Sequence, residues 1–213
     1  MVASERAGPG RRSRLVWPRS TQQRHRLPIG ETVPEDLFRP QLGEPHHHAY
    51  VVENIETTVN RLADQLGAGP FFLVENVPLE NVQSRGEPAE LVHNSAFGCC
   101  GRGAIELMEI ISSAPERVEE RFSAPRPRIH HVAYVVSPAE VPEVRESLDE
   151  RGLPQYLSAE LGETHSTLHD ASASLGHDIE IHDDVPGLRD FFEMVSGGAE
   201  GWDGSEPLRP VES

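Results

Sequence analysis

Residues 46–52, His-His-His-Ala-Tyr-Val-Val, return as residues 130–136, His-His-Val-Ala-Tyr-Val-Val, with six of the seven positions identical. Each copy is followed downstream by a second matching stretch, Ile105-Glu106-Leu107 in one case and Ile179-Glu180-Ile181 in the other. β-Branched and aromatic residues in such runs favour strands. We therefore interpret the chain as an internal duplication, in which a strand that bears His and a strand that bears Glu each occur twice.

The segments between these stretches predict the same order of elements in both copies. The first copy predicts a strand at 46–52, a helix over Ile55–Leu66, and strands at Phe71–Val74, Glu90–Gly98 and Ala104–Ile111. The helix is predicted from Asn54 as its N-cap, from one apolar face and from Gly67 as its stop. The second copy predicts a strand at Ile129–Val136, a helix over Val141–Arg151, and strands near Gln155–Ser158, Ser166–Asp170 and Asp178–His182. The predicted fold class is thus α+β, with two tandem βαβββ modules.

These elements divide the chain into five parts. The modules take residues 45–112 and 129–185, and a polar, Pro-containing linker at 113–128 joins them. Residues 1–44 are rich in Arg and Pro without a sustained period, so they are interpreted as a flexible N-terminal extension. Residues 186–213 are interpreted as a C-terminal amphipathic helix, Leu188–Val195, followed by a Gly-rich acidic tail.

Charge and composition exclude several classes of function. All 19 basic residues are Arg, so chemistry through a Lys Schiff base is excluded. Residues 28–213 hold 12 Arg against 34 acidic residues, and a body this acidic repels nucleic acids and anionic membranes. The Arg-rich start is interpreted as a flexible tail rather than a nucleic-acid arm. With no apolar run of about 18 residues and no signal-peptide pattern, we expect a cytoplasmic protein.

The repeated strands predict a shared polar site. Side chains alternate across a strand, so His47 lies on the face opposite His48, and the repeats align His47 with His131. Glu106 and Glu180 stand between apolar residues, where a buried carboxylate is costly unless a positive group meets it. Each residue alone has a simpler explanation, as part of a solvated loop or the exposed face of a sheet. Their repetition at equivalent positions favours a common cation site.

Three segments resemble the vicinal oxygen chelate superfamily: the His-Val-Ala-Tyr-Val-Val strand, Leu-Gly-Ala-Gly-Pro-Phe-Phe after the first helix, and Ile-Glu-Leu-Met-Glu. That superfamily includes glyoxalase I, methylmalonyl-CoA epimerase, extradiol dioxygenases, and bleomycin- and fosfomycin-resistance proteins. The resemblance covers roughly residues 45–185 and is closest to the glyoxalase-like and epimerase-like branch. It implies a cupped mixed β-sheet around a central metal, with His47, Glu106, His131 and Glu180 as ligands, and it implies a homodimer.

The resemblance also implies a chemistry. Two imidazoles and two carboxylates suit one divalent metal, namely Ni, Co, Zn, Mn or Fe(II). Such a metal would bind a small-molecule substrate with vicinal oxygens and stabilise the enediolate or enolate formed when a proton leaves the adjacent carbon. This is the chemistry of a metal-dependent lyase, isomerase or epimerase. Glu180 is the predicted base, with Glu106 as its counterpart and Glu75 as a base that does not bind the metal.

Three alternatives remain open at this stage. An extradiol dioxygenase would use two His and one Glu, and the presence of Glu106 in the fourth position argues against it. An antibiotic-binding resistance protein would sequester a small molecule and need no metal, and a biosynthetic cyclase could reuse the same cup. His165, His169 and His182 are further candidates to line the cup, more in keeping with supporting positions than with catalysis. The substrate itself is not readable from the sequence.

Overall fold

The two repeated stretches form the central pair of strands in one mixed sheet. In the computed structural model, which describes residues 42–123 and 127–211, β1 (His47–Val52) pairs antiparallel with β7 (Arg128–Val136). The described residues all belong to one structural unit, Phe38–Ser213. Most of the predicted extension, 1–44, therefore lies outside the described residues, which begin at residue 42.

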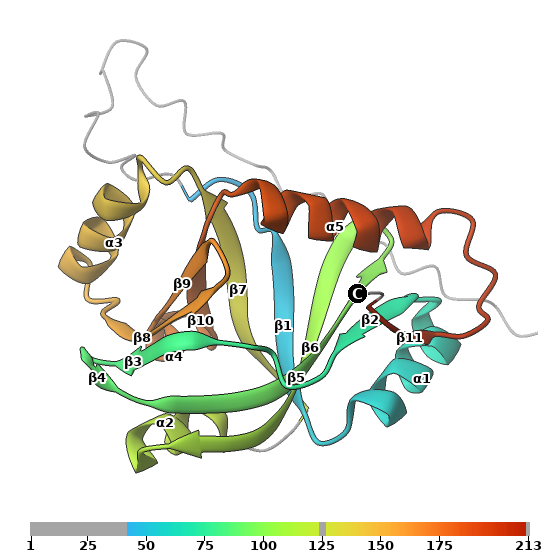
Figure 1. The fold of residues 1–213 in the computed structure, drawn as a ribbon, viewed down its shortest axis with the longest axis horizontal. Coiled ribbons are helices and arrows are strands. Elements are labelled where there is room, and N and C mark those ends of the chain that lie inside the picture. Colours follow the sequence, from blue (N-terminus) through green and yellow to red (C-terminus); the bar gives the residue numbers. More distant parts are fainter. Residues whose placement is uncertain (1–41, 124–126, 212–213) are drawn as a thin grey trace, which may run out of the picture. The chain divides into compact units, whose positions relative to one another are not determined.

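Each repeat builds the predicted βαβββ module. The first comprises β1, α1 (Ile55–Leu66), β2 (Phe71–Val74), β5 (Glu90–Cys100) and β6 (Gly103–Ala114). The second comprises β7, α3 (Val141–Glu150), β8 (Gln155–Leu161), β9 (Thr164–His169) and β10 (Asp178–Asp183), with a short α4 (Ser172–Leu175) before its last strand. The predicted α+β class, with two modules in one curved sheet, is confirmed (Figure 1).

Helices α1 and α3 pack against the face of the sheet opposite to the four predicted ligands. Helix α1 begins where Asn54 accepts a hydrogen bond from the Thr57 amide, and it ends at Gly67, whose φ of 62° few other residues adopt. It buries Ile55 and Val59 against Leu107 of β6, and α3 buries an equivalent apolar face against Ile179 and Ile181 of β10. Burial of each such side chain is worth roughly 1.5–3 kcal/mol.

The strand order places the repeats at the centre and other segments at the edges. The described sheet runs β11-β2-β5-β6-β1-β7-β10-β9-β8-β3-β4. Within it, β3 (Glu80–Ser84) and β4 (Glu87–Pro88) come from the first module but pair beyond β8 of the second. No strand was predicted here, because Val82 is the lone apolar residue of β3 and the main partner strand, β8, is distant in the sequence.

Two further segments differ from the sequence prediction. The predicted linker, 113–128, contains α2 (Glu116–Phe122), which was missed because two apolar residues, Val118 and Phe122, are too short a pattern to predict a helix. They lie four positions apart on one helix face and are both buried. The predicted helix Leu188–Val195 is the middle of a longer α5 (Pro186–Ala199), and the predicted tail contains β11 (Leu208–Pro210), which pairs with β2.

Candidate metal centre

Four adjacent strands at the middle of the sheet each contribute one predicted ligand. In the first module, Glu106 of β6 pairs with Ala49, two residues after His47. In the second, Glu180 of β10 pairs with the residue two positions after His131. Because β1 and β7 pair across the centre, Ala49 also stands opposite His131. The two halves therefore present the same His and Glu pattern in the same register.

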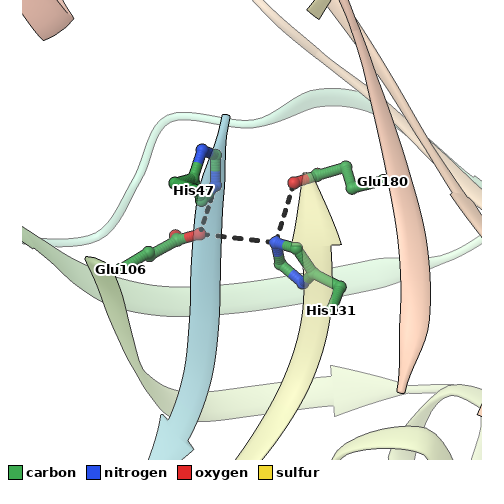
Figure 2. A group of neighbouring side chains, drawn as sticks. All are labelled: His47, Glu106, His131 and Glu180. Atoms are coloured by element: carbon green, nitrogen blue, oxygen red, sulfur yellow. Dashed lines mark ion pairs between the residues drawn. The ribbon is translucent and has the colours of Figure 1, made fainter. Parts of the chain in front are cut away.

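The four side chains converge on one point, as Figure 2 shows. One ligand atom from each lies within 4.8 Å of the others. Glu106 Oε2 is 3.4 Å from His47 Nε2 and 3.5 Å from His131 Nε2, and Glu180 Oε2 is 2.8 Å from His131 Nε2. Both imidazoles are 2% exposed and Glu106 is 6% exposed, so water does not compensate their charges.

The geometry around the imidazoles fits a cation. Nε2 of His47 and Nε2 of His131 are both buried, and neither makes a hydrogen bond of acceptable geometry to the described residues. This holds for His131 even though Glu180 Oε2 is close to it, since distance alone does not align a hydrogen bond. Buried nitrogens that make no hydrogen bond are costly. Two imidazole and two carboxylate donors of this kind suit a divalent transition metal.

Charges within the cluster stabilise one another. Burial opposes ionisation of Glu106, but the His131 and His47 imidazoles outweigh it and hold the pKa of the carboxyl below its usual range. Burial also opposes ionisation of Glu180, yet His182 and His131 hold its pKa well below the usual value. Burial lowers the pKa of His131, but Glu180 and Glu106 outweigh burial and raise it to about 10. Without a cation, a proton on His131 therefore balances one of the two negative charges.

The cluster lies in the wall of a cavity of about 650 Å³. The same cavity is lined by Ser95, whose hydroxyl donates to Glu106 Oε1 at 2.6 Å, and by His182, whose Nε2 is 3.0 Å from Glu180 Oε2. Helix α5 closes one side, with the Phe192 ring stacked on His47 at 5.4 Å between centroids. A cavity of this size holds a drug-sized molecule.

The family is decided by a comparison with known families. The model of the Glyoxalase/Bleomycin resistance protein/Dioxygenase superfamily matches residues 46–165, more than half of the chain. The chain belongs to this superfamily. The match contains both repeated His strands and the strand of Glu106, and it ends before the strand of Glu180 and before α5. The resemblance to the vicinal oxygen chelate superfamily is thereby confirmed.

Solved structures similar to this member of the superfamily match it at low identity and at TM-scores below 0.5. Methylmalonyl-CoA epimerase from Mycobacterium tuberculosis is 16% identical, with a TM-score of 0.44 over 68% of this chain and 91% of that one. A hypothetical protein from Bacillus halodurans C-125 is 18% identical, with a TM-score of 0.45 over 67% and 94%. A Streptomyces coelicolor methylmalonyl-CoA epimerase variant in complex with 2-nitronate-propionyl-CoA is 12% identical, with a TM-score of 0.41 over 68% and 97%. A search of the curated proteins found no match.

In this superfamily member, each of the two predicted His ligands is preceded by a second His that contacts it. His46 Nδ1 is 3.0 Å from His47 Nδ1, and His130 Nδ1 is 3.0 Å from His131 Nδ1. Burial is the main reason that the pKa of His46 falls to about 4 and that the pKa of His130 lies well below the usual value. Both are therefore neutral at physiological pH. The doubled His-His in the repeats was the available signal for these residues.

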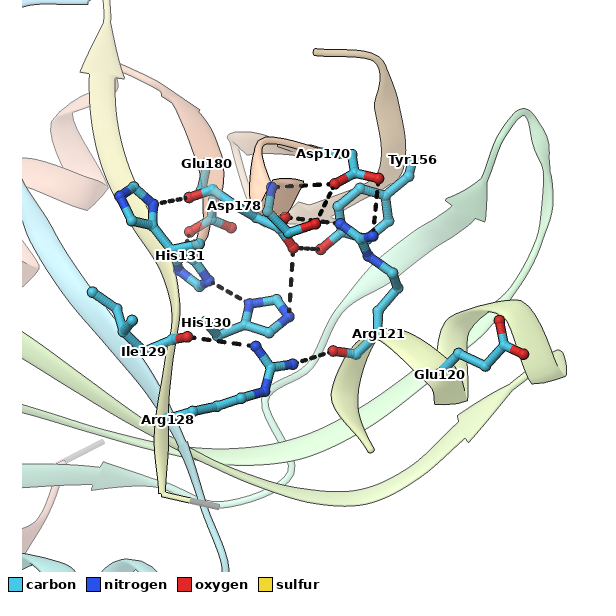
Figure 3. A network of polar contacts seen from close by, with 12 residues as sticks. Glu120, Arg121, Arg128, Ile129, His130, His131, Tyr156, Asp170, Asp178 and Glu180 are labelled. Atoms are coloured by element: carbon cyan, nitrogen blue, oxygen red, sulfur yellow. Dashed lines mark hydrogen bonds and ion pairs between the residues drawn. The ribbon is translucent and has the colours of Figure 1, made fainter. Parts of the chain in front are cut away.

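His130 is itself held by a polar network from the second module and α2, drawn in Figure 3. Its ring stacks on Phe122 with centroids 4.5 Å apart, and its Nε2 is 4.0 Å from Asp178 Oδ2. Asp178 also accepts a hydrogen bond from the Tyr156 hydroxyl at 2.8 Å and pairs with Arg121 at 2.8 Å. Arg121 and Phe122 both belong to α2, so the segment predicted to be a linker supports the site.

Of the other residues predicted for the site, three do not line the cavity and one, His182, does. Glu75 is exposed just after β2 and does not line the cavity, so its position does not support the predicted role as a base. His165 contacts Arg145 at 2.7 Å, and His169 lies 3.1 Å from the Leu153 carbonyl oxygen; neither lines the cavity. His182 does line it.

Sequence reasoning missed His93 and Ser95, which line the cavity from β5. His93 is 5% exposed, and burial lowers its pKa, so the ring is neutral. In the second module, Ser166 of β9 stands opposite His182 as Ser95 stands opposite Met108, so the repeat offered a signal for Ser95. Thr164 begins β9, and the repeat offered no such signal for His93. The described residues also include no helix that is both long and apolar enough to cross a membrane.

Proposed function

We propose that this chain is a metal-dependent enzyme that moves a proton on a carbon next to a carbonyl, as a lyase, an isomerase or an epimerase. The observation that carries the proposal is the cluster of His47, Glu106, His131 and Glu180 in the wall of a cavity, with both Nε2 atoms within 3.5 Å of a carboxylate oxygen but without a hydrogen bond. Membership of the superfamily supports a small-molecule substrate. The predicted homodimer stays a prediction.

The four side chains would hold one divalent cation, with Ni, Co, Zn, Mn or Fe(II) suited to two nitrogen and two oxygen donors. When bound, such a cation supplies Lewis-acid chemistry, which stabilises negative charge that develops on a substrate oxygen as the neighbouring carbon loses its proton. The presence of four donors rather than three argues against the extradiol dioxygenase alternative. Burial of His47, His131 and Glu106 strengthens these electrostatic interactions.

The two carboxylates differ in a way that supports Glu180 as the base. Glu106 is anchored from one side, because the buried Ser95 hydroxyl donates to its Oε1 at 2.6 Å. Glu180 instead shares its Oε2 between His131 at 2.8 Å and His182 at 3.0 Å. His182 is therefore placed to accept a proton that Glu180 has taken from a substrate. The Ser166 hydroxyl, 2.6 Å from His182 Nδ1, orients that ring.

The metal assignment is tested by elemental analysis of protein purified without added metal salts. We expect about one divalent ion per chain in the wild type and little in the His47→Ala, His131→Ala double variant, because that change removes both nitrogen donors. Circular dichroism of both proteins checks that they are folded. Equal metal content in two folded proteins would contradict the proposed site.

The base assignment is tested by exchange of a substrate hydrogen with deuterium from the solvent. A panel of α-hydroxy-thioester, hemithioacetal and catechol substrates is offered to the wild type, Glu180→Gln and Glu163→Gln. Glu163 is an exposed carboxylate at the cavity rim and serves as the matched control. We expect Glu180→Gln to keep much of its metal and to lose about 10²–10⁴-fold in exchange, since an amide cannot take the proton.

Other outcomes of that panel would replace the proposal. Oxygen uptake with catechol would indicate the dioxygenase. Tight binding with no exchange in any variant would indicate sequestration of the kind expected of a resistance protein. Full exchange activity in Glu180→Gln would contradict the assignment of the base while leaving the metal site intact.

A further inference from the structure

Three segments outside the two repeated modules complete the cavity. The β3–β4 segment inserted into the first module contributes Val77 and Leu79 from its approach to β3. Helix α5 contributes Leu188, Phe191 and Phe192 from one face. Val211 comes from the end of the described chain, just after β11. Figure 1 shows α5 crossing the sheet above β1 and β6, and the ring contacts of Phe192 with His46 and His47 place it against β1.

These added segments bring no polar side chain to the cavity wall. Besides the six residues just named, they contribute Pro78, Val185 and Gly187, none of which can pair with a charged group. The opposite wall adds apolar side chains from the sheet, among them Leu91, Met108 and Leu157. We call this part of the cavity, with the added segments on one side and these sheet residues on the other, the apolar chamber.

The polar residues that line the cavity are the predicted ligands, the residues that contact them, and a few others: His93 of β5, and Ser158, Glu163 and Thr164 from β8, β9 and their turn. Ser95 and His182 contact Glu106 and Glu180 directly, and Ser166 contacts His182. Among the described residues that line the cavity, none is Arg, and the sequence has no Lys. Glu163 at the rim adds a further negative charge. A phosphate or carboxylate on the distal part of a substrate would find no cation in this wall, and desolvating it would be costly.

We infer that the substrate is an uncharged, largely apolar molecule whose vicinal oxygens face the His and Glu cluster while its body fills the apolar chamber. This inference rests on the proposed function for the oxygen-bearing end alone. It excludes substrates that carry a nucleotide or peptide handle, whose phosphates or carboxylates need basic partners. Burial of the apolar body against Leu188, Phe191 and the facing sheet residues supplies the affinity.

The experiment uses probes that share one chelating group and differ in their apolar body. Zinc-loaded protein is titrated with 3-hydroxyflavone, which carries neighbouring carbonyl and hydroxyl oxygens on an aromatic body, and with maltol, which carries the same pair on a small ring. Coenzyme A is the anionic probe. We expect 3-hydroxyflavone to bind at least about tenfold more tightly than maltol, since the extra rings enter the chamber. Coenzyme A at millimolar concentration should not displace it.

Variants of α5 separate the chamber from the metal cluster. The double variant Leu188→Ala, Phe191→Ala should lose about tenfold or more in affinity for 3-hydroxyflavone and less than about twofold for maltol. Met194→Ala is the matched control, because Met194 lies on α5 but is exposed and does not line the cavity. It should change neither affinity. Metal content should be equal in all three proteins.

A probe without chelating oxygens keeps this inference separable from the proposed function. N-Phenyl-1-naphthylamine should bind the chamber of the wild type and of the folded His47→Ala, His131→Ala variant with similar fluorescence gain. If this probe binds but the wild type takes up no metal, the proposed function is contradicted, while the apolar chamber remains a ligand site. Absence of binding by either aromatic probe, equal binding of maltol and 3-hydroxyflavone, or displacement by coenzyme A would overturn the inference.

Discussion

His46 and His130 show how a residue next to a predicted ligand can decide whether that ligand is usable. Each places its Nδ1 3.0 Å from Nδ1 of the following His, so one nitrogen of each pair must donate and the other accept. If His47 and His131 present Nε2 to a metal, their Nδ1 atoms carry the hydrogens and the preceding, neutral His accepts. With the hydrogens placed in this way, the pair stabilises the tautomer that leaves Nε2 free for coordination.

We expect His130→Leu to weaken metal affinity by about 10–100-fold, because the Nδ1–H of His131 would lose its acceptor in a buried site. His130→Asn should restore most of the affinity, since the Asn side-chain oxygen can accept from nearly the same place. The dissociation constant is measured by competition with a chromophoric chelator. His48→Leu is the control, because His48 is exposed on the other side of His47.

Equal losses in His130→Leu and His130→Asn would argue for a different role. In that case the stacking of the imidazole on Phe122, rather than the hydrogen bond, would be what positions His131. The spectrum of bound Co²⁺ distinguishes the two explanations, because a tilted imidazole changes the ligand field even where affinity survives.

At the scale of elements, sequence patterns predict what local residues decide and miss what distant partners decide. The bounds of α1 and β2 agree with the prediction, and those of α1 do so because its N-cap, Asn54, and its Gly stop, Gly67, lie in the sequence itself. The four predicted ligands lie together because both repeats keep one register. By contrast, β3 exists through pairing with β8, and α2 through packing of Val118 and Phe122 into a core cluster of sheet residues; a local pattern reveals neither.

Gly98 of β5 lies so close to Phe71 and Pro70 that a side chain at this position would clash with them. A Cβ on Gly98 would lie 2.7 Å from the Phe71 ring and 2.8 Å from the Pro70 carbonyl oxygen. The Pro70 carbonyl is a backbone group directly before β2, so it cannot rotate away as a side chain could. We expect Gly98→Ala to lower the free energy of unfolding by about 1–3 kcal/mol, measured by urea denaturation.

Gly103→Ala is the matched control for this strand pair. Gly103 lies at the start of β6, opposite Cys100 of β5, and an added Cβ there would meet its nearest atom at an ordinary 3.7 Å. It should change stability by less than about 0.5 kcal/mol. If both substitutions were equally costly, backbone freedom rather than the Phe71 contact would explain the Gly98 effect.

For the unit that contains both modules, the predicted cation site is also a connection between halves of the sheet. Glu106 and His47 come from the first module, and His131 and Glu180 come from the second. A ligand that binds the native state alone raises its stability by about 2.7 kcal/mol when its free concentration is 100 times its dissociation constant. Metal binding should therefore stabilise the pairing of β1 with β7 as well as the site.

This stabilisation should depend on pH in a direction that His131 decides. In the metal-free protein, burial opposes the charged ring, but Glu180 and Glu106 raise its pKa from 6.5 to about 10. A raised pKa contributes stability that is full below pH 6.5 and is lost as the pH rises toward about 10. A metal coordinates the neutral imidazole, so its binding releases this proton. Binding therefore becomes more favourable as the pH rises from 6.5 toward about 10.

We therefore expect the increase in Tm on adding Co²⁺ to be larger near pH 8.5 than near pH 6.5, and chelation by EDTA to reverse it at both values. Differential scanning calorimetry of wild-type protein with Co²⁺ or with EDTA measures the difference. The folded His47→Ala, His131→Ala variant should show no Co²⁺-dependent change at either pH. A shift that shrinks as the pH rises would mean that His131 is neutral before the metal arrives, and that the carboxylates are balanced by another group.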